Sequence, residues 1–420
     1  MSSPYYTSAE SLTPRKEICN YFAGFPVYAL AWSRREDRGA FRMAVSSFSE
    51  EPSNSLQVVQ LSPQHDASHI PERADFGVVA ATSVDYPLSK IQWQPGLGPD
   101  LVAGVGDALH IWECEMSGEV GEMGLSRGRL RARSKLTTRA DYAAPITSMD
   151  WNTINPRLVL TSSIDTTCTL WDVETQQAKT QLIAHDREVF DVSFVAGSQD
   201  VFVSAGADGS VRMFDLRALE HSTILYEAPA AVAPSTDSLN DHANARLSSF
   251  TPPLLRLSCN AVDPNYIATF ALDSNRVSIV DVRNPGAAVA QLCGHQAPVH
   301  AISWSPTSPT QLCSAGADSR VLVWDIHQAL SARQHQQRQA VAAAAQAKHL
   351  GRISNKATDA PSIHAAAHAA AAHALAQQPV PVAPSLTYAA RLPVNSLAWH
   401  QSSPEWVSIA FGSTVQTLRL

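Results

Sequence analysis

The hexapeptide VFDVSF at residues 189–194 is one of seven copies of a pattern: an apolar residue, two of any kind, a second apolar residue, one more, then Trp, Phe or Cys. The copies end at Trp32, Trp93, Trp151, Phe194, Cys259, Trp304 and Trp399. The first apolar position is occupied by Val27, Leu88, Ile146, Val189, Leu254, Val299 and Val394. The second apolar position is occupied by Leu30, Ile91, Met149, Val192, Leu257, Ile302 and Leu397. Such repetition predicts one structural unit present seven times.

A second repeated feature follows five of the hexapeptides at a nearly constant distance. It is an apolar residue followed by an acidic one, found at Trp112-Glu113, Trp171-Asp172, Phe214-Asp215, Val280-Asp281 and Trp324-Asp325. Its offset from the hexapeptide is 19 to 21 residues, whereas successive hexapeptides are 43 to 95 residues apart. A rigid unit with connectors of variable length explains both spacings.

Short alternating runs lie between the two features, such as RLVLT at residues 157–161 and TCTLW at residues 167–171. Alternation of this length predicts strands. Tight turns between strands are expected at Asp165, Asp208, Asp273 and Asp318. Three inner strands per repeat and an outer strand from the connector make a four-stranded blade. The predicted fold class is therefore all-β, a seven-bladed β-propeller whose exposed strand edges are short outer ones.

The two ends of the chain are expected to meet in the seventh blade. That repeat ends at Leu420 after TVQTL at residues 414–418, and so it lacks an outer strand. The segment EICNYF at residues 17–22 alternates as a strand does and precedes the first repeat. We predict that this N-terminal strand closes the ring. The propeller then covers residues 15–420, and residues 1–14 form a flexible N-terminus.

Three segments interrupt the repeats and are expected to be disordered inserts: residues 115–140, 228–252 and 331–388. The first is rich in Gly and Arg, which is typical of a solvated connector between blades or, alternatively, of a patch for nuclear import or an acidic partner. The second is rich in Ala, Pro, Ser and Asn. The first half of the third is compatible with a helix, although its composition does not support a packed core.

The composition excludes several classes of function. A net charge of −7 over 420 residues gives no support to direct nucleic-acid binding. No apolar segment is long enough to span a membrane and no signal core occurs at the start, so a soluble protein without membrane contact is expected. The chain has no Gly-x-Ser-x-Gly elbow, phosphate loop or Cys-x-x-Cys pair. We therefore expect no catalytic residue, no cofactor and no metal.

Polar residues that resemble catalytic triads are expected to be structural. One buried chain of hydrogen bonds can run from a turn carboxylate through an imidazole and a hydroxyl to an indole N–H. The sixth repeat holds the full set, His295, Ser314, Asp318 and Trp324. The fourth repeat, in which Phe214 replaces the indole, holds His185, Ser204 and Asp208. The third repeat, with Tyr142 at the histidine position, holds Thr161, Asp165 and Trp171.

Two consecutive repeats carry the tripeptide Asp-x-Arg after the third predicted strand. They are Asp215-Leu216-Arg217 and Asp281-Val282-Arg283. Equivalent positions in neighbouring blades are expected to place both arginines on one face. Two guanidinium groups suit carboxylates or carbonyls of a protein partner; the alternative is that each arginine neutralises an acid of a neighbouring blade. These four charged residues are the candidate docking residues.

Several longer stretches resemble one family of WD-repeat proteins. The similarity is strongest in GADGSVRMFDLR at residues 206–217 and continues in LEHSTI at residues 219–224. It extends to RKEI at residues 15–18, TSSIDTTCT at residues 161–169, QLIAHD at residues 181–186 and DPNY at residues 263–266. The chain resembles the family of the plant transparent testa glabra protein and the animal DDB-and-CUL-associated factor seven. The similarity covers all seven blades and omits the three inserts.

The resemblance implies a non-catalytic scaffold that brings dual-specificity protein kinases and transcription regulators together. It also implies an alternative, a substrate receptor of a cullin-RING ubiquitin ligase that docks on the ligase's propeller adaptor through the two Asp-x-Arg boxes. In those boxes Phe214 and Val280 replace the family's Trp. We expect a monomeric propeller within complexes, located in cytoplasm and nucleus. An enzyme with a pocket on the propeller axis is a third possibility, and it needs convergent acids, a metal or a nucleophile there.

Overall fold

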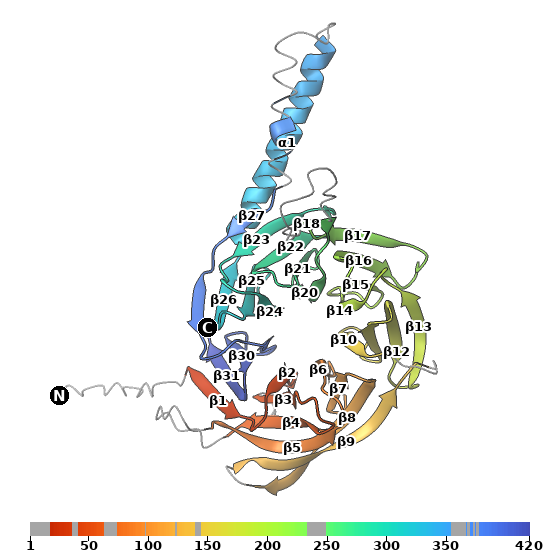
Figure 1. Cartoon of the computed structure of the whole chain (residues 1–420), viewed down its shortest axis with the longest axis vertical. Coiled ribbons are helices and arrows are strands. Elements are labelled where there is room, and N and C mark those ends of the chain that lie inside the picture. Colours follow the sequence, from red (N-terminus) through yellow and green to blue (C-terminus); the bar gives the residue numbers. More distant parts are fainter. Residues whose placement is uncertain are drawn as a thin grey trace, which may run out of the picture.

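Strands of seven sheets surround a common axis in the computed structural model of the chain (Figure 1). The structure describes residues 17–420 except 36–40, 63–73, 97, 122–123, 139–143, 233–248, 354–366, 368–369, 373 and 375–377. Each blade has four antiparallel strands, and blade five has a fifth, parallel one. The prediction of an all-β, seven-bladed propeller is confirmed.

Blades one to four each use four consecutive strands. Blade one consists of β2 (Val27–Trp32), β3 (Arg42–Ser47), β4 (Asn54–Leu61) and β5 (Phe76–Val84). Blade two consists of β6 (Lys90–Trp93), β7 (Leu101–Val105), β8 (Leu109–Val120) and β9 (Ser126–Leu136). Blade three consists of β10 (Ile146–Trp151), β11 (Leu158–Ser163), β12 (Thr167–Asp172) and β13 (Gln177–Ile183). Blade four consists of β14 (Val189–Phe194), β15 (Val201–Gly206), β16 (Ser210–Asp215) and β17 (Ser222–Glu227).

The last three blades recruit strands from more distant parts of the chain. Blade five consists of β20 (Leu254–Cys259), β21 (Tyr266–Ala271), β22 (Arg276–Asp281), β23 (Ala288–Cys293) and the parallel β27 (Val380–Val382). Blade six consists of β24 (Val299–Trp304), β25 (Gln311–Gly316), β26 (Arg320–Asp325) and β28 (Leu386–Ala389). Blade seven consists of β29 (Ser396–Trp399), β30 (Trp406–Phe411), β31 (Thr414–Arg419) and β1 (Ile18–Phe22).

The predicted closure of the ring is confirmed, because β1 pairs antiparallel with β31 from Ile18 opposite Leu418 to Phe22 opposite Thr414. The same segment also reaches blade one. The backbone N–H of Asp75 donates to the carbonyl of Asn20 at 2.8 Å, and the Asn20 N–H donates to the Asp75 carboxylate at 2.8 Å. Residues near the start of the chain therefore join the last blade to the first.

A β-bulge in the innermost strands explains the spacing of the hexapeptide. In β14 the register shifts between Val189 and Asp191, and equivalent shifts occur in β2, β10, β20 and β24. A bulge takes one residue out of the alternation, so the first, fourth and sixth positions share one face. Those positions are apolar and pack in seven clusters, each formed between two neighbouring blades. The third and fifth positions are left on the other face.

The expectation that residues 115–140 form a disordered insert is wrong. Most of them belong to the two long outer strands of blade two, β8 and β9, which pair with each other. The arginines occupy every second position of β9 and are exposed, whereas Leu130 and Leu136 are buried on the other side. This strand period was masked by the Gly- and Arg-rich composition. Cross-strand ion pairs, such as Arg129 with Glu115 at 2.5 Å, lie on its exposed side.

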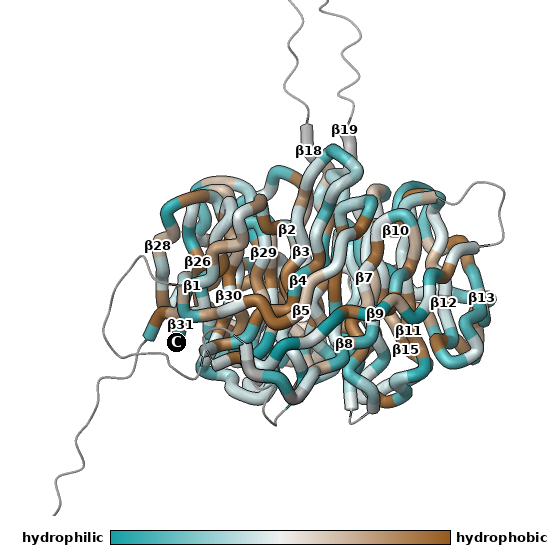
Figure 2. Tube along the Cα trace, turned by 90° about the horizontal axis from the view of Figure 1, so that it is seen from below, coloured by the Kyte–Doolittle hydropathy of each residue, from teal (hydrophilic) through white to brown (hydrophobic). Residues whose placement is uncertain are grey.

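The other two inserts have ordered ends. In the second, β18 (Ala231–Val232) pairs with β19 (Ser249–Phe250) and both rise from one face of the ring (Figure 2), while residues 233–248 lie outside the described part. The third insert begins in a helix, α1 (His327–Ile353), which extends outward from the rim (Figure 1). Among the described residues, no helix is long and apolar enough to cross a membrane.

The end of the third insert is part of the propeller, which corrects the expectation that it is disordered. β27 pairs with β23 in blade five, and β28 pairs with β26 as the outer strand of blade six. α1 is thus inserted between the third and fourth strands of one blade. The Pro-rich composition misled the prediction because proline is tolerated in edge strands, where one side of the backbone needs no partner. The predicted flexible N-terminus, residues 1–14, lies outside the described residues.

Candidate functional site

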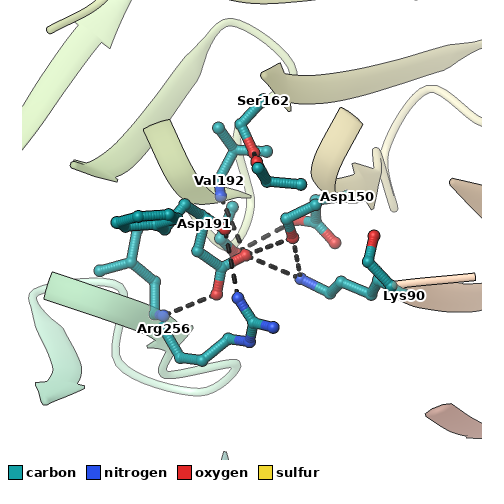
Figure 3. A network of polar contacts seen from close by, with 12 residues as sticks. Lys90, Asp150, Ser162, Asp191, Val192 and Arg256 are labelled. Carbon is teal, nitrogen blue, oxygen red and sulfur yellow. Dashed lines mark hydrogen bonds and ion pairs between the residues drawn. The ribbon is translucent and has the colours of Figure 1, made fainter. Parts of the chain in front are cut away.

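Polar residues gather around the propeller axis (Figure 3), at positions that the hexapeptide pattern leaves variable. Its third position is Lys90 in β6, Ser148 in β10, Asp191 in β14 and Arg256 in β20. These strands belong to four consecutive blades. In β10, β14 and β20 the bulge turns this position away from the apolar face, and three of the four residues line a channel of about 460 Å³.

Asp191 connects four blades through its carboxylate and is only 1% exposed. Its Oδ1 accepts hydrogen bonds from Lys90 Nζ at 3.1 Å and from the Val192 N–H at 2.9 Å, and the Ser148 hydroxyl donates to the same atom. Its Oδ2 accepts from the Leu257 N–H at 2.7 Å. One side chain thus joins blades two, three, four and five.

The fifth position of the hexapeptide has a similar role. Gln92 Oε1 accepts from the Trp151 N–H at 2.8 Å, and Asp150 Oδ2 accepts from the Phe194 N–H at 2.8 Å. Gln92 Nε2 also donates to Asp150 Oδ1 at 2.9 Å. Each innermost strand has an unpaired backbone edge toward the axis, whose N–H groups need acceptors. Side chains of the preceding blade supply them.

These contacts assign the channel a structural role. The two carboxylates at its wall, Asp150 and Asp191, each accept at least three hydrogen bonds from neighbouring strands and side chains. No group of three or more His, Cys, Asp or Glu side chains within the described residues is placed to hold a metal ion. The charged side chains Lys90, Asp150 and Asp191 of the channel wall bond to groups of neighbouring blades.

Sequence reasoning missed this network because it treated the third and fifth positions of the hexapeptide as free. A signal was present: four consecutive copies have Lys90, Ser148, Asp191 and Arg256 at the third position. The first copy, by contrast, has Ala29 there. What the pattern did not show is that a bulge directs these residues toward one another.

The polar residues of blade six form the expected chain of hydrogen bonds. His295 Nδ1 lies 3.0 Å from Asp318 Oδ1, and His295 Nε2 lies 2.7 Å from Ser314 Oγ. The Trp324 indole N–H donates to Ser314 Oγ at 2.8 Å. The carboxylate therefore accepts from Nδ1–H and the hydroxyl donates to Nε2; the links to Ser314 are buried and the link to the turn carboxylate is partly buried. The hydroxyl is bound on both sides and has no solvent exposure.

Blade four holds the same arrangement without the indole. His185 Nδ1 lies 2.9 Å from Asp208 Oδ1, and His185 Nε2 lies 2.7 Å from Ser204 Oγ. The Phe214 ring stacks on Phe202 instead, with 5.1 Å between centroids. Burial opposes ionisation of Asp208, but hydrogen bonds from His185 and from the Ser210 turn outweigh it and hold the pKa of that carboxyl well below its usual range.

The described residues of blade three show one link of the chain. The Trp171 indole N–H donates to Thr161 Oγ1 at 2.8 Å. Within the described residues Asp165 is not linked to them; it accepts from the Thr167 N–H at 3.1 Å within its own exposed turn. The expected link between this turn and the core ran through Tyr142, so the membership of Asp165 in the network stays a prediction. Tyr142, at the histidine position, lies outside the described residues.

The buried imidazole of blade six predicts a pH dependence of stability. Burial lowers the pKa of His295 below its ordinary value of 6.5, although Asp318 opposes the shift and Arg320 and His300 add to it. As the pH falls through 6.5, the unfolded chain binds the proton before the folded one does. The stability that the neutral imidazole contributes is therefore complete above pH 6.5 and is lost as the pH falls through the folded-state pKa.

We expect His295→Gln to lower the free energy of unfolding by about 1–3 kcal/mol at neutral pH, because it leaves buried partners unpaired. It should also reduce the fall in melting temperature between about pH 7 and pH 5. The control is His221→Gln, which changes an exposed histidine. Thermal unfolding followed by circular dichroism measures both effects. An unchanged pH slope in the His295 variant contradicts this account.

The first Asp-x-Arg box lies in the turn after β16. Arg217 Nε donates to Asp215 Oδ1 at 2.9 Å, and Arg217 Nη2 donates to Asp215 Oδ2 at 2.6 Å. These bonds lower the pKa of Asp215 to about 2. The arginine side chain is 70% exposed. The bidentate pair uses two of the five N–H donors of the guanidinium group and holds the side chain in one orientation.

The second box lies at the equivalent turn after β22. Arg283 Nε donates to Asp281 Oδ1 at 2.8 Å and its Nη2 donates to Asp281 Oδ2 at 2.7 Å. Nη2 also donates to the Tyr266 hydroxyl at 3.0 Å, and the guanidinium lies over the Tyr266 ring. The side chain is 54% exposed. A backbone hydrogen bond of 2.8 Å from Gly286 to Leu225 links the two neighbouring blades beside these turns.

The two boxes therefore have one geometry on adjacent blades. The alternative considered from the sequence, that each arginine neutralises an acid of a neighbouring blade, is wrong: each pairs with the aspartate of its own box. The residues that replace the family's Trp, Phe214 and Val280, are buried in the core. The replacement of Trp by these two residues therefore leaves the Asp and the Arg of each box unchanged.

Comparisons with known proteins agree with this architecture. The family model "WD domain, G-beta repeat" matches residues 134–172, 176–215 and 286–325. A Dictyostelium discoideum protein named DDB1- and CUL4-associated factor 7 homolog is 38% identical over 97% of this chain and 99% of its own length. An uncharacterized WD repeat-containing protein of Schizosaccharomyces pombe is 40% identical over 74% of this chain and 70% of its own length. The chain belongs to the WD-repeat family of DDB1- and CUL4-associated factor 7.

Proposed function

We propose that this protein is a non-catalytic adaptor that holds other proteins together through the outer surfaces of its propeller. The observation that carries the proposal is the pair of exposed, pre-oriented arginines, Arg217 and Arg283, at equivalent turns of neighbouring blades. Arginine is enriched in the energetic centres of protein interfaces. A side chain already fixed by its own aspartate loses little conformational entropy when a partner binds.

The partners proposed for this adaptor are dual-specificity protein kinases and transcription regulators, in cytoplasm and nucleus. The support is the resemblance to a family of scaffolds and the match, along nearly the whole chain, to a relative of that family. Purification of the tagged full chain followed by mass spectrometry tests the partner classes, and imaging of a fluorescent fusion tests the location. Recovery of neither a kinase nor a transcription regulator would contradict this assignment.

A second candidate function is that of a substrate receptor of a cullin-RING ubiquitin ligase. It is supported by the name of the Dictyostelium relative, which refers to DDB1 and CUL4, and by the two Asp-x-Arg boxes. In this proposal the guanidinium groups of Arg217 and Arg283 dock on the ligase's propeller adaptor. The bidentate pairs hold both guanidinium groups, which are more than half exposed, at equivalent turns of blades four and five.

The test is a pull-down of the full chain that carries Arg217→Ala and Arg283→Ala. Loss of the ligase adaptor while the kinase is retained would show two separate surfaces. The matched control changes two other exposed arginines, Arg187→Ala and Arg276→Ala, and should retain both partners. Absence of the adaptor from the wild-type pull-down ends the receptor proposal but leaves the scaffold proposal standing. Arg217→Lys tests whether docking needs the planar guanidinium group, because lysine keeps the positive charge but lacks the parallel N–H donors of arginine.

A further inference from the structure

The first turns of α1 pack on blade five and form a groove with it. Ile326 and Ala329 are buried in the same cluster as β21, β22 and β23, and Leu330 packs against it. α1 also contacts β27, which is the added parallel strand of that blade. Beyond this contact the helix extends away from the ring (Figure 1). We call the cavity of about 540 Å³ between α1 and blade five the helix groove.

The helix groove has apolar walls and three charged residues. Val289 of β23 and Leu330, Ala340 and Val341 of α1 are among its apolar lining. The charged residues that line it are Asp281, Arg283 and Arg333. Two positive charges and one negative charge leave an excess of one positive charge. Because Asp281 and Arg283 are paired with each other, the excess belongs to Arg333.

Arg333 has an unsatisfied guanidinium edge. The residue is only 3% exposed. Its Nη1 donates to the carbonyl of Gln378 at 3.0 Å, but within the described part of the chain neither Nε nor Nη2 has a hydrogen-bond partner. The Oε1 of the nearby Gln336 is likewise unpaired there. Asp281 is the nearby counter-charge, but it forms hydrogen bonds to Arg283 and none to Arg333 within the described residues. Buried N–H groups of a guanidinium without acceptors are costly, and an edge of this kind suggests a ligand.

The chain itself shows what fits this edge of an arginine. In both Asp-x-Arg boxes, Nε and Nη2 bind the two oxygens of one carboxylate. Parallel N–H···O bonds to a carboxylate are the characteristic geometry of this fork. A carboxylate carries one negative charge and would balance the single excess charge of the helix groove. A phosphoryl dianion would leave an unbalanced negative charge between apolar walls.

We propose that the helix groove binds a partner segment that inserts one Asp or Glu carboxylate against the Nε–Nη2 edge of Arg333, with apolar residues on either side of the acid. The contact requires a small outward movement of α1, which packs on β23 and β27. The occupant is an acidic, otherwise apolar peptide segment of another protein. This site deepens the adaptor role but does not depend on docking through Arg217.

The experiment selects peptides from a random display library on the full wild-type chain, with the Arg333→Gln chain as counter-selection. We expect the selected peptides to share an Asp or Glu flanked by apolar residues. In fluorescence anisotropy, their affinity should fall about tenfold or more for Arg333→Gln. Replacing the peptide's acid by its amide should cause a similar loss. The two changes together should cost little more than either alone, because they remove one contact.

Two variants on the exposed face of α1 keep the test independent of any effect of Arg333 on folding. Val341 lines the helix groove and is 71% exposed, and both Glu and Lys are good helix formers. Val341→Lys should tighten peptide binding and Val341→Glu should weaken it, each by roughly two- to fivefold. Arg338→Gln, which changes another exposed residue of α1, is the control and should have no effect.

Three outcomes overturn the proposal. The first is that no acidic motif is enriched. The second is that the selected peptides bind Arg333→Gln and wild type equally well. The third is that a phosphoserine peptide binds more tightly than its glutamate counterpart, which would assign the site to a phosphorylated partner. Arg217 lies outside the helix groove, so the variant Arg217→Ala should leave peptide binding intact. Failure here is therefore distinguishable from failure of the docking proposal.

Discussion

Deletion of residues 15–23 is expected to lower the melting temperature by an amount on the order of 10 °C. The deletion removes β1, the outermost strand of blade seven. Five consecutive residue pairs join it to β31. The backbone N–H of Ala23 also donates to Ser413, and that of Arg419 donates to Glu17, each at 2.9 Å. Among the described strands, none other than β1 pairs with this edge of β31, so after the deletion its backbone groups are left to water.

The size of the effect follows from what β1 buries. Cys19 and Tyr21 lie in the cluster between blades seven and one, and burying a large apolar side chain contributes about 1.5–3 kcal/mol. The Tyr21 hydroxyl donates to Gln57 of blade one. Without β1, the β31 edge becomes an exposed template for pairing with other chains. We therefore expect aggregation as well as destabilisation.

The matched control removes residues 1–14 alone and retains the strand. It should melt within about 2 °C of the full chain, because changes away from the core usually alter stability by about 0.5 kcal/mol or less. Differential scanning calorimetry on both truncations, together with light scattering, measures stability and aggregation. If the chain without β1 melted like the control, the ring would be held by contacts between blades alone, and the closing strand would be dispensable.

The architecture could be predicted because propeller cores repeat. The sixth residue of each hexapeptide fills an equivalent space between two blades, so an apolar residue recurs at the same position of each repeat. In the first three copies this residue is Trp32, Trp93 and Trp151. The closing strand could also be predicted, because a sheet that lacks an outer strand must find one elsewhere in the chain. Both arguments depend on apolar alternation, which sequence displays directly.

Composition was a poorer guide to the inserts. Arg129 and Arg131 belong to a strand, although a run of basic residues usually indicates a solvated connector. Val380 and Val382 pair with blade five despite the prolines beside them. In each case a neighbouring strand supplied the hydrogen bonds that fixed the segment. Such tertiary partners are not visible in local composition.

The candidate sites were only partly predictable for a related reason. The sequence showed that Arg217 and Arg283 occupy equivalent positions, but not that each folds back onto its own aspartate. It did not single out Arg333, because its burial depends on how α1 packs on blade five. Nor did it reveal the contacts of Asp191, because the bulge in β14 sets the direction of that side chain. The direction of a side chain depends on local backbone irregularities, such as a bulge, and a repeat pattern in the sequence does not show them.

Asp191→Ala should lower the free energy of unfolding by about 2–5 kcal/mol, because it removes a buried carboxylate that accepts several hydrogen bonds and pairs with a partly buried cation. The variant leaves Lys90 Nζ without the carboxylate that it contacts at 3.1 Å. It also leaves the Leu257 N–H without the acceptor that it has at 2.7 Å. Four blades lose a common bonding partner. Urea unfolding followed by tryptophan fluorescence measures the loss.

Asp186→Ala is the matched control in the same blade. Asp186 also pairs with a cation, Arg212 Nη2 at 2.8 Å, but its side chain is 83% exposed. Exposed ion pairs contribute about 0–1 kcal/mol, so this change should have little effect. The comparison separates burial at the axis from the mere presence of an ion pair.

A double variant, Asp191→Leu with Lys90→Met, distinguishes two explanations of the loss. Replacing both members of a buried pair by apolar residues is often neutral, so stability should partly return. It should not return fully, because the Leu257 N–H still lacks its acceptor, which costs about 1–3 kcal/mol. Full recovery would mean that only the charge of Lys90 matters. No loss in the single variant would mean that the apolar clusters between blades hold the ring without the axial network.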